Sequence, residues 1–366
     1  MSYTADQRAP AASYWQKIAN WAAPLFQKKF CIIGPRADAL IIYGSPLLGV
    51  LVLLSLSNTG LWYTIAAFNY EEGILSFVCG VLTTAHLLAV GFRSHLNKEV
   101  FSRWPLRFTV IPVLLFVALS ANLWFLVIAS VVAVIWDAYH AGMQNFGLAR
   151  IYDMRMGNDA HAGRLLDSMM NQVLYAGPLL AGVTLAFHVD SINNFAEVGA
   201  AALTTLPQNV MGHAQLIRWI VIPVCLLICA IYVIGYWRLS KKGYQISPQK
   251  VLLMLSMGVA SIISWGFNPF ATAFAAMNVY HAIQYFGILY AREGNAIAKT
   301  CKIDRAPPKL KPWLIIAILL VPTCAYGIWE MLATPGWDRV FALILTVTLL
   351  HYWYDGFIWS VRKKQV

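Results

Sequence analysis

The chain has 366 residues, of which 59% are hydrophobic and 12% are charged, whereas an average soluble domain carries about 25% charged residues. This composition excludes a soluble multidomain protein and indicates one membrane-embedded helical bundle. The net charge of +11 does not point to a nucleic-acid partner, because the Lys and Arg residues fall in short clusters between long apolar runs.

The first 37 residues precede the first apolar run. They contain no apolar stretch of the kind that forms the centre of a cleavable signal peptide. Trp15, Ile18, Trp21 and Leu25 recur at helical spacing, which favours an amphipathic helix lying on the membrane surface. A partly ordered tail is the alternative, and the sequence leaves both open.

Ten apolar runs follow, and most approach the length of about 20 residues that a transmembrane helix needs. They are Asp38–Leu56, Gly73–Phe92, Leu106–Ser120, Asn122–Ala149, Leu165–Phe187, Leu216–Trp237, Val251–Gly266, Pro269–Ala291, Pro312–Met331 and Trp337–Val361. The third and seventh runs are short, so nine spans are the alternative. With the N-terminus inside, every cationic cluster falls on the cytoplasmic side, as the positive-inside rule requires.

We therefore predict an all-α, polytopic integral membrane bundle of about ten transmembrane helices with both termini cytoplasmic. Its parts are a cytoplasmic N-terminal segment (1–37), one transmembrane domain (38–361) and a cytoplasmic tail (362–366). The location that fits this organisation is a bacterial inner membrane. The six cysteines lie mostly inside apolar runs, which argues against a disulfide framework.

Two of the runs resemble each other. Tyr139-His140-Ala141 is followed by Gln144, Phe146-Gly147 and Arg150, and Tyr280-His281-Ala282 is followed by Gln284, Phe286-Gly287 and Arg292. Either an ancient duplication or chance similarity between apolar segments explains this. Duplicated membrane proteins often place their sites where the repeats meet.

Four of the eight histidines stand inside confidently apolar runs, where ionisable residues are costly and usually mark a functional site. They are His86, His140, His281 and His351. Each precedes the first cytoplasmic cation of its own helix by seven to eleven residues, which places all four roughly 10–17 Å from the cytoplasmic ends. A single buried histidine is most simply a hydrogen-bonded contact between helices. Four at one depth predict a metal or haem site.

Polar neighbours of these histidines extend the site. Asp137 and Gln144 share a helix face with His140, Gln284 and Tyr285 follow His281, and Asp355 follows His351 by one turn. We predict Asp355 as a metal ligand and, with Tyr285, as a catalytic residue. Gln144, Gln284 and Asp137 are predicted to orient the ligands or the substrate.

The other histidines are weaker candidates. His95 could be a further metal ligand if its helix bends, and His161 could cover the site from a cytoplasmic loop. His188 and His213 are predicted to be surface residues on the opposite side of the membrane.

Two segments, Tyr139-His140-Ala141-Gly142-Met143-Gln144 and His351-Tyr352-Trp353-Tyr354-Asp355, resemble the bacterial Brp/Blh membrane proteins. Those are iron-dependent enzymes that cleave β-carotene to retinal. The resemblance implies a shared type of non-haem iron site and not a shared substrate, since this chain is longer and lacks the His-Gly-Ala-x-Asp motif. The same segments are also similar to uncharacterised bacterial membrane proteins with His-x-x-x-Gln helices.

Imidazole and carboxylate together suit iron, zinc or copper better than magnesium or calcium. The leading hypothesis is an iron-dependent oxygenase or oxidoreductase with one or two non-haem ions. Its partners would be a lipid-soluble substrate and O₂ from the bilayer, and an electron donor where the chemistry requires one. Copper, zinc and haem b stay open as cofactors. A haem-bearing electron carrier and a metal or proton-coupled transporter are the alternatives.

Overall fold

The computed structural model describes residues 13–58, 64–65, 70–185, 201–333, 336 and 338–359. The predicted cytoplasmic tail (362–366), His188 and residues 1–12 lie outside this part. Helix α1 (Tyr14–Ala22) begins at Ser13, whose side chain and that of Gln16 cap each other's backbone N–H groups. Its side chains Trp15, Ile18 and Trp21 are exposed, as an amphipathic surface helix requires.

Short turns connect α1 to the bundle: η1 (Ala23–Phe26), η2 (Lys28–Phe30), α2 (Pro35–Ala37) and the π-helical turn η3 (Asp38–Ile42). The first apolar run was predicted to enter the membrane from Asp38. In the structure its regular helix starts only at Ser45, because the buried Asp38 carboxylate accepts hydrogen bonds from the backbone N–H groups of Ile32 and Ile33 and from Tyr152. Asp38 therefore closes a turn.

Each of the ten apolar runs corresponds to a helix. These are α3 (Ser45–Asn58), α4 (Ile74–Ala89), α7 (Pro105–Ala121), α8 (Leu123–Arg155), α9 (Arg164–Ala181), α11 (Ala201–Lys241), α12 (Pro248–Phe267), α13 (Phe270–Thr300), α14 (Lys311–Leu332) and α15 (Arg339–Ile358). Two short helices, α5 (Gly91–Ser94) and α6 (Lys98–Arg103), link α4 to α7, and β1 (Thr64–Ile65) pairs with β2 (Tyr70–Gly73) in a small antiparallel hairpin. The prediction of a helical bundle is confirmed.

Polar residues and prolines set the helix boundaries. The side chain of Asn122 caps α8 after a one-residue break from α7, and the Asp338 carboxylate caps α15 in the same way. Pro269 lacks a backbone N–H and stands immediately before α13, so α12 ends at Phe267 and a new helix begins.

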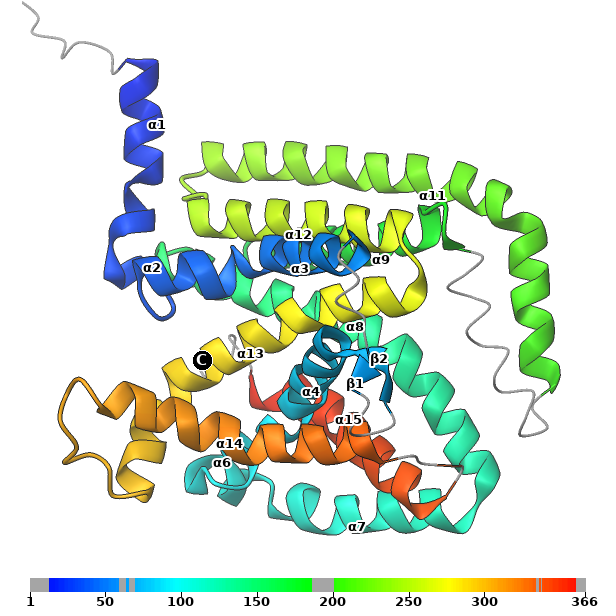
Figure 1. The fold of residues 1–366 in the computed structure, drawn as a ribbon. Coiled ribbons are helices and arrows are strands. Elements are labelled where there is room, and N and C mark those ends of the chain that lie inside the picture. Colours follow the sequence, from blue (N-terminus) through cyan, green and yellow to red (C-terminus); the bar gives the residue numbers. More distant parts are fainter. Residues whose placement is uncertain are drawn as a thin grey trace, which may run out of the picture.

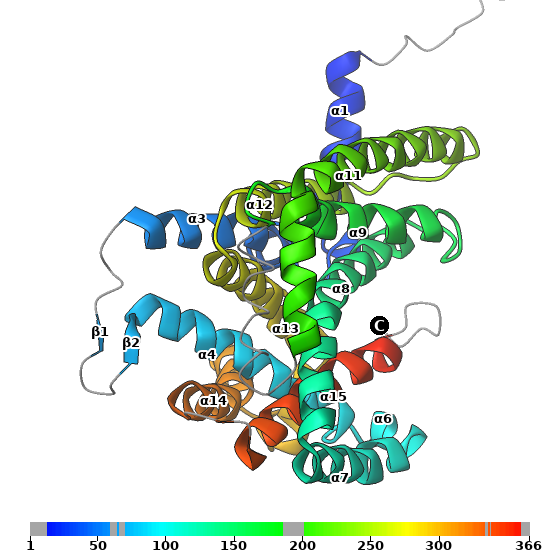
Figure 2. The same ribbon diagram turned by 90° about the vertical axis from the view of Figure 1, so that its right-hand side faces the viewer.

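The long helices form two groups joined by a central pair. Helices α3, α9, α11 and α12 lie on one side, and α4, α7, α14 and α15 lie on the other (Figure 1). Helices α8 and α13 contact members of both groups and run between them (Figure 2). These two carry the similar segments around His140 and His281, so residues from both groups can meet along them.

Within the described part of the chain, six helical segments are long and apolar enough to cross a membrane, which indicates an integral membrane protein. They are Ser76–Ser94, Leu123–Arg155, Gly212–Lys241, Pro248–Phe267, Lys311–Leu332 and Arg339–Ile358. The most apolar window of Gly212–Lys241 buries none of its residues against the described protein, as is typical of a helix that faces lipid or another protein. The remaining four helices are shorter (α3, α7) or carry more polar residues (α9, α13), and a full set of ten spans stays a prediction.

Candidate metal centre

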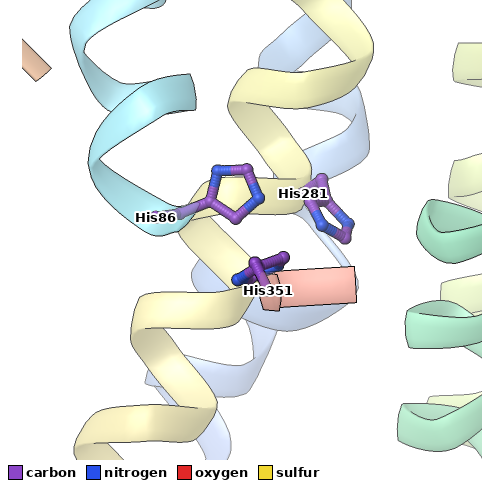
Figure 3. Close-up of side chains that lie close together, drawn as sticks. All are labelled: His86, His281 and His351. Atoms are coloured by element: carbon purple, nitrogen blue, oxygen red, sulfur yellow. The ribbon is translucent and has the colours of Figure 1, made fainter. Parts of the chain in front are cut away.

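The four histidines predicted to share a depth meet at one point. His86 comes from α4, His140 from α8, His281 from α13 and His351 from α15, and all four side chains are buried. Figure 3 shows three of them, His86, His281 and His351, facing one another from separate helices. The ring centroids of neighbouring imidazoles are 4.8–5.1 Å apart.

Several ring nitrogens have no hydrogen-bond partner among the described residues. His86 must donate its Nδ1 proton to the carbonyl of Thr83, because a carbonyl can only accept, and this leaves His86 Nε2 as a bare lone pair. That atom and both ring nitrogens of His281 are buried without a partner. Each such buried polar atom costs about 1–3 kcal/mol. A cation held between the rings would remove this cost for the nitrogens that it binds.

Asp355 faces the same cluster from one turn beyond His351. Its Oδ1 accepts hydrogen bonds from the Tyr285 hydroxyl at 3.1 Å and from Trp359 Nε1 at 2.9 Å. Its Oδ2 lies 3.7 Å from His140 Nε2 and 3.6 Å from His351 Nε2, and these two nitrogens are 3.2 Å apart. Two ligand atoms that share one ion at about 2.1 Å are themselves roughly 3.0–3.4 Å apart. The distances of 3.2–3.7 Å among Asp355 Oδ2, His140 Nε2 and His351 Nε2 are close to this separation.

The donor atoms make two overlapping ligand sets that could hold a metal. One consists of His86, His281 and His351, and the other of His140, His351 and Asp355. His351 belongs to both. The second set combines two histidines with one carboxylate, the combination typical of non-haem ferrous sites with open coordination positions. A haem needs room for its macrocycle between two axial ligands. Imidazoles in edge-to-face contact leave no such slot, so the geometry favours bare ions.

A cavity of about 640 Å³ reaches the second ligand set. His140, Asp355 and Tyr285 line it, whereas His86 and His281 do not. Its volume is within the range of about 300–1,000 Å³ that small-molecule sites have. A ligand in this cavity would therefore meet the side of the site that carries the carboxylate.

The structure gives the bonding partners of the three residues predicted to orient the ligands or the substrate, and one of them, Gln144, lines the cavity. Gln144 donates to the backbone carbonyl of His281 and to the side chain of Gln284, which in turn donates to the carbonyl of Ile42. Both glutamines thus connect α8, α13 and η3 and contact no imidazole nitrogen. Asp137 accepts from the Tyr352 hydroxyl at 2.9 Å and from Asn278, not from His140. Tyr352 packs against the His140 ring and thus lies between Asp137 and that imidazole.

The remaining histidines stay apart from the cluster. His95 Nε2 donates to the carbonyl of Phe108, and its Nδ1 contacts the Ser94 hydroxyl, so it is not brought to the metal site. His161 is exposed in the segment before α9, and His213 is exposed on α11, as predicted for a surface residue. His188 lies outside the described residues.

No protein-family model, curated protein or solved structure matches this chain. The comparisons therefore assign no family, and the chemistry of the site rests on its own residues.

Two side chains near Asp355, those of Trp359 and Arg93, were missed by the sequence analysis. Trp359 holds Asp355 and stands one turn after it, so the helical spacing alone could have revealed it. Arg93 packs over the Trp359 ring, with 4.1 Å from its guanidinium carbon to the ring centroid, and donates to the Ile358 carbonyl and to Glu293. Nothing in the sequence links Arg93 to Glu293 or Ile358, which are 200 and 265 positions away.

Proposed function

We propose that the protein is a membrane-embedded metalloenzyme, an iron-dependent oxidoreductase that acts on a lipid-soluble substrate with O₂. The observation that carries the proposal is the set of His140, His351 and Asp355, two imidazoles and one carboxylate whose donor atoms lie 3.2–3.7 Å apart beside a cavity. Ferrous iron at such a set supplies one-electron and O₂ chemistry while keeping coordination positions free for a substrate.

The surrounding residues support a reactive site more than a purely structural one. A structural metal is closed on all sides by protein ligands, whereas this ligand set opens onto the cavity. Tyr285 and Trp359 hold Asp355 by Oδ1 and leave Oδ2 directed toward the histidine pair. Tyr285 also lines the cavity, where its hydroxyl can hold or deliver a proton next to a bound substrate.

The proposal includes a location. A lipid-soluble substrate and O₂ both concentrate in the apolar phase that surrounds α7 and α11, whose outward side chains include the exposed Leu114 and Leu227. We place the protein in a bacterial inner membrane with the cationic helix ends in the cytoplasm.

The test is metal analysis of the detergent-purified full chain, prepared without oxygen, together with its visible absorption spectrum. We expect iron and no haem absorption band. Alanine at His86, His140, His281 or His351 should each lower the iron content, and iron should stimulate O₂ consumption in the presence of membrane lipid extract. His213→Ala is the matched control because His213 is exposed and, among the described residues, forms a hydrogen bond only with the carbonyl of Asn209.

Equal metal content in all five variants would contradict the proposal and would leave the four histidines as contacts between helices. A haem spectrum would replace the oxygenase with an electron carrier.

A further inference from the structure

Two arginines that the proposed metal site does not use line the cavity. Arg107 at the start of α7 and Arg164 at the start of α9 both line the cavity and are exposed. Neither forms an ion pair with an acidic side chain among the described residues. The Arg107 guanidinium carbon lies 5.0 Å from the centroid of the Phe357 ring, and that of Arg164 lies 5.5 Å from the Phe146 ring. These contacts limit the positions that the two cations can take.

A third arginine in the cavity wall, Arg150, contributes little free charge. It binds Asp153 at 3.0 Å and Asp167 at 2.7 Å, and both acids also bind the buried Lys250. Two cations and two carboxylates in one buried cluster compensate each other. The uncompensated positive charge in the cavity wall therefore comes from Arg107 and Arg164.

The wall of the cavity also contains few acidic side chains and many aromatic ones. Among its described lining residues Asp355 is the sole acid, and it stands beside the histidines. Aromatic side chains form much of the remaining wall: Trp136, Tyr139, Phe146, Trp353 and Phe357. A ligand that fits this surface has an apolar body for the aromatic wall and a negative group for the arginines.

We propose that the cavity binds an anionic amphiphile, with a carboxylate or phosphate head group at Arg107 and Arg164 and an apolar chain extending toward His140 and Asp355. This inference deepens the proposed function, because it names the substrate class of the metal site. The binding step itself uses no metal ligand, so it can be tested apart from the metal.

The test uses the full chain in nanodiscs of zwitterionic phosphatidylcholine and the fluorescent 18-carbon acid cis-parinaric acid. Energy transfer from tryptophan reports binding, since Trp136, Trp353 and Trp359 line the cavity, and empty nanodiscs give the background. We expect saturable binding that palmitate or hexadecyl phosphate displaces. Hexadecanol has the same chain without a charge and inorganic phosphate has the charge without a chain, so neither should compete at equal concentration. The stronger of the two anionic competitors identifies the head group.

Arg107→Gln and Arg164→Gln should each weaken the binding of cis-parinaric acid about tenfold, the value of one charge-assisted hydrogen bond. Arg107→Lys should restore part of the loss because it keeps the charge. Arg305→Gln is the matched control, since Arg305 is an exposed arginine outside the cavity. Elution as a single species and unchanged iron content show that each variant is folded.

Competition by hexadecanol as strong as that by palmitate, or unchanged binding in both glutamine variants, overturns the inference. Two measurements separate the two proposals: the iron content of the untreated protein, and the same titration on chelator-treated protein, which shows binding without the metal. Charge-dependent binding by protein that was purified without iron retains the amphiphile site and removes the metalloenzyme. Bound iron in the untreated protein without charge-dependent binding does the reverse.

Discussion

The Nε2 atoms of His140 and His351 lie 3.2 Å apart although the two residues are 211 positions apart in the chain. The contact brings together α8 and α15, and His351 at the same time belongs to the ligand set of His86 and His281. We therefore expect His351→Ala to lower bound iron more than His86→Ala. The His351 variant removes a ligand from both sets, whereas the His86 variant removes a ligand from one set. The double variant His140→Ala/His351→Ala should lose little beyond His351→Ala. Metal analysis of these three variants, of His140→Ala and of the unchanged protein checks this, and independent losses that multiply in the double variant would contradict it.

Asp355 and Asp137 should respond differently to removal of their charge. Asp355→Asn replaces the carboxylate that faces both histidines, so iron content and O₂ consumption should both fall by at least tenfold. Asp137→Asn should keep the iron and lower activity only partly, because an amide oxygen can still accept the hydrogen bond from Tyr352. Full iron content in Asp355→Asn would show that the carboxylate is not a ligand.

The Trp359 indole is expected to act through Asp355. Trp359→Phe removes the 2.9 Å hydrogen bond to Asp355 Oδ1 and keeps an aromatic ring under Arg93. Loss of such an outer hydrogen bond typically weakens metal binding about 10–100-fold. Competition with a chelator measures the change. Trp329→Phe on α14, which has no contact with the site, should leave the affinity as it is, and an equal affinity in both variants would argue against the role of Trp359.

The buried charge cluster predicts a large stability effect at one lysine. Lys250 is 1% exposed and its Nζ lies 2.8 Å from Asp153, 2.6 Å from Asp167 and 2.5 Å from the Tyr236 hydroxyl. Lys250→Met leaves two buried carboxylates with a single cation, which should cost about 3–5 kcal/mol of unfolding free energy. Thermal unfolding in detergent should show a lower Tm, and the exposed Lys242→Met should unfold like the unchanged protein.

The same cluster supports the predicted orientation. Arg150, Asp167, Tyr236 and Lys250 come from the end of α8, the start of α9, the end of α11 and the start of α12, so these four ends lie on one side. The positive-inside rule assigns that side to the cytoplasm. A fluorescent protein fused after Val366 should fluoresce, and alkaline phosphatase fused there should be inactive. Active phosphatase at that position would rule out ten spans with both ends inside.

The sequence by itself determined the class of protein and the members of its central cluster. Charged and polar groups are costly in hydrocarbon, so four histidines in apolar runs stand out without any structure. Helical rise then translates their distances from the cytoplasmic cations into one depth, and His86, His140, His281 and His351 do meet in space.

Only the tertiary structure decided which neighbours serve these histidines. Asp137 and Asp355 each stand about one helical turn from a histidine, but Asp355 faces the paired nitrogens whereas Asp137 turns to Tyr352. Gln144 and Gln284 share a helix face with histidines, yet they bind each other and the backbone. Spacing along one helix fixes the direction of a side chain only relative to that helix. The rotation and crossing of neighbouring helices, which depend on packing across the whole bundle, decide what the side chain meets.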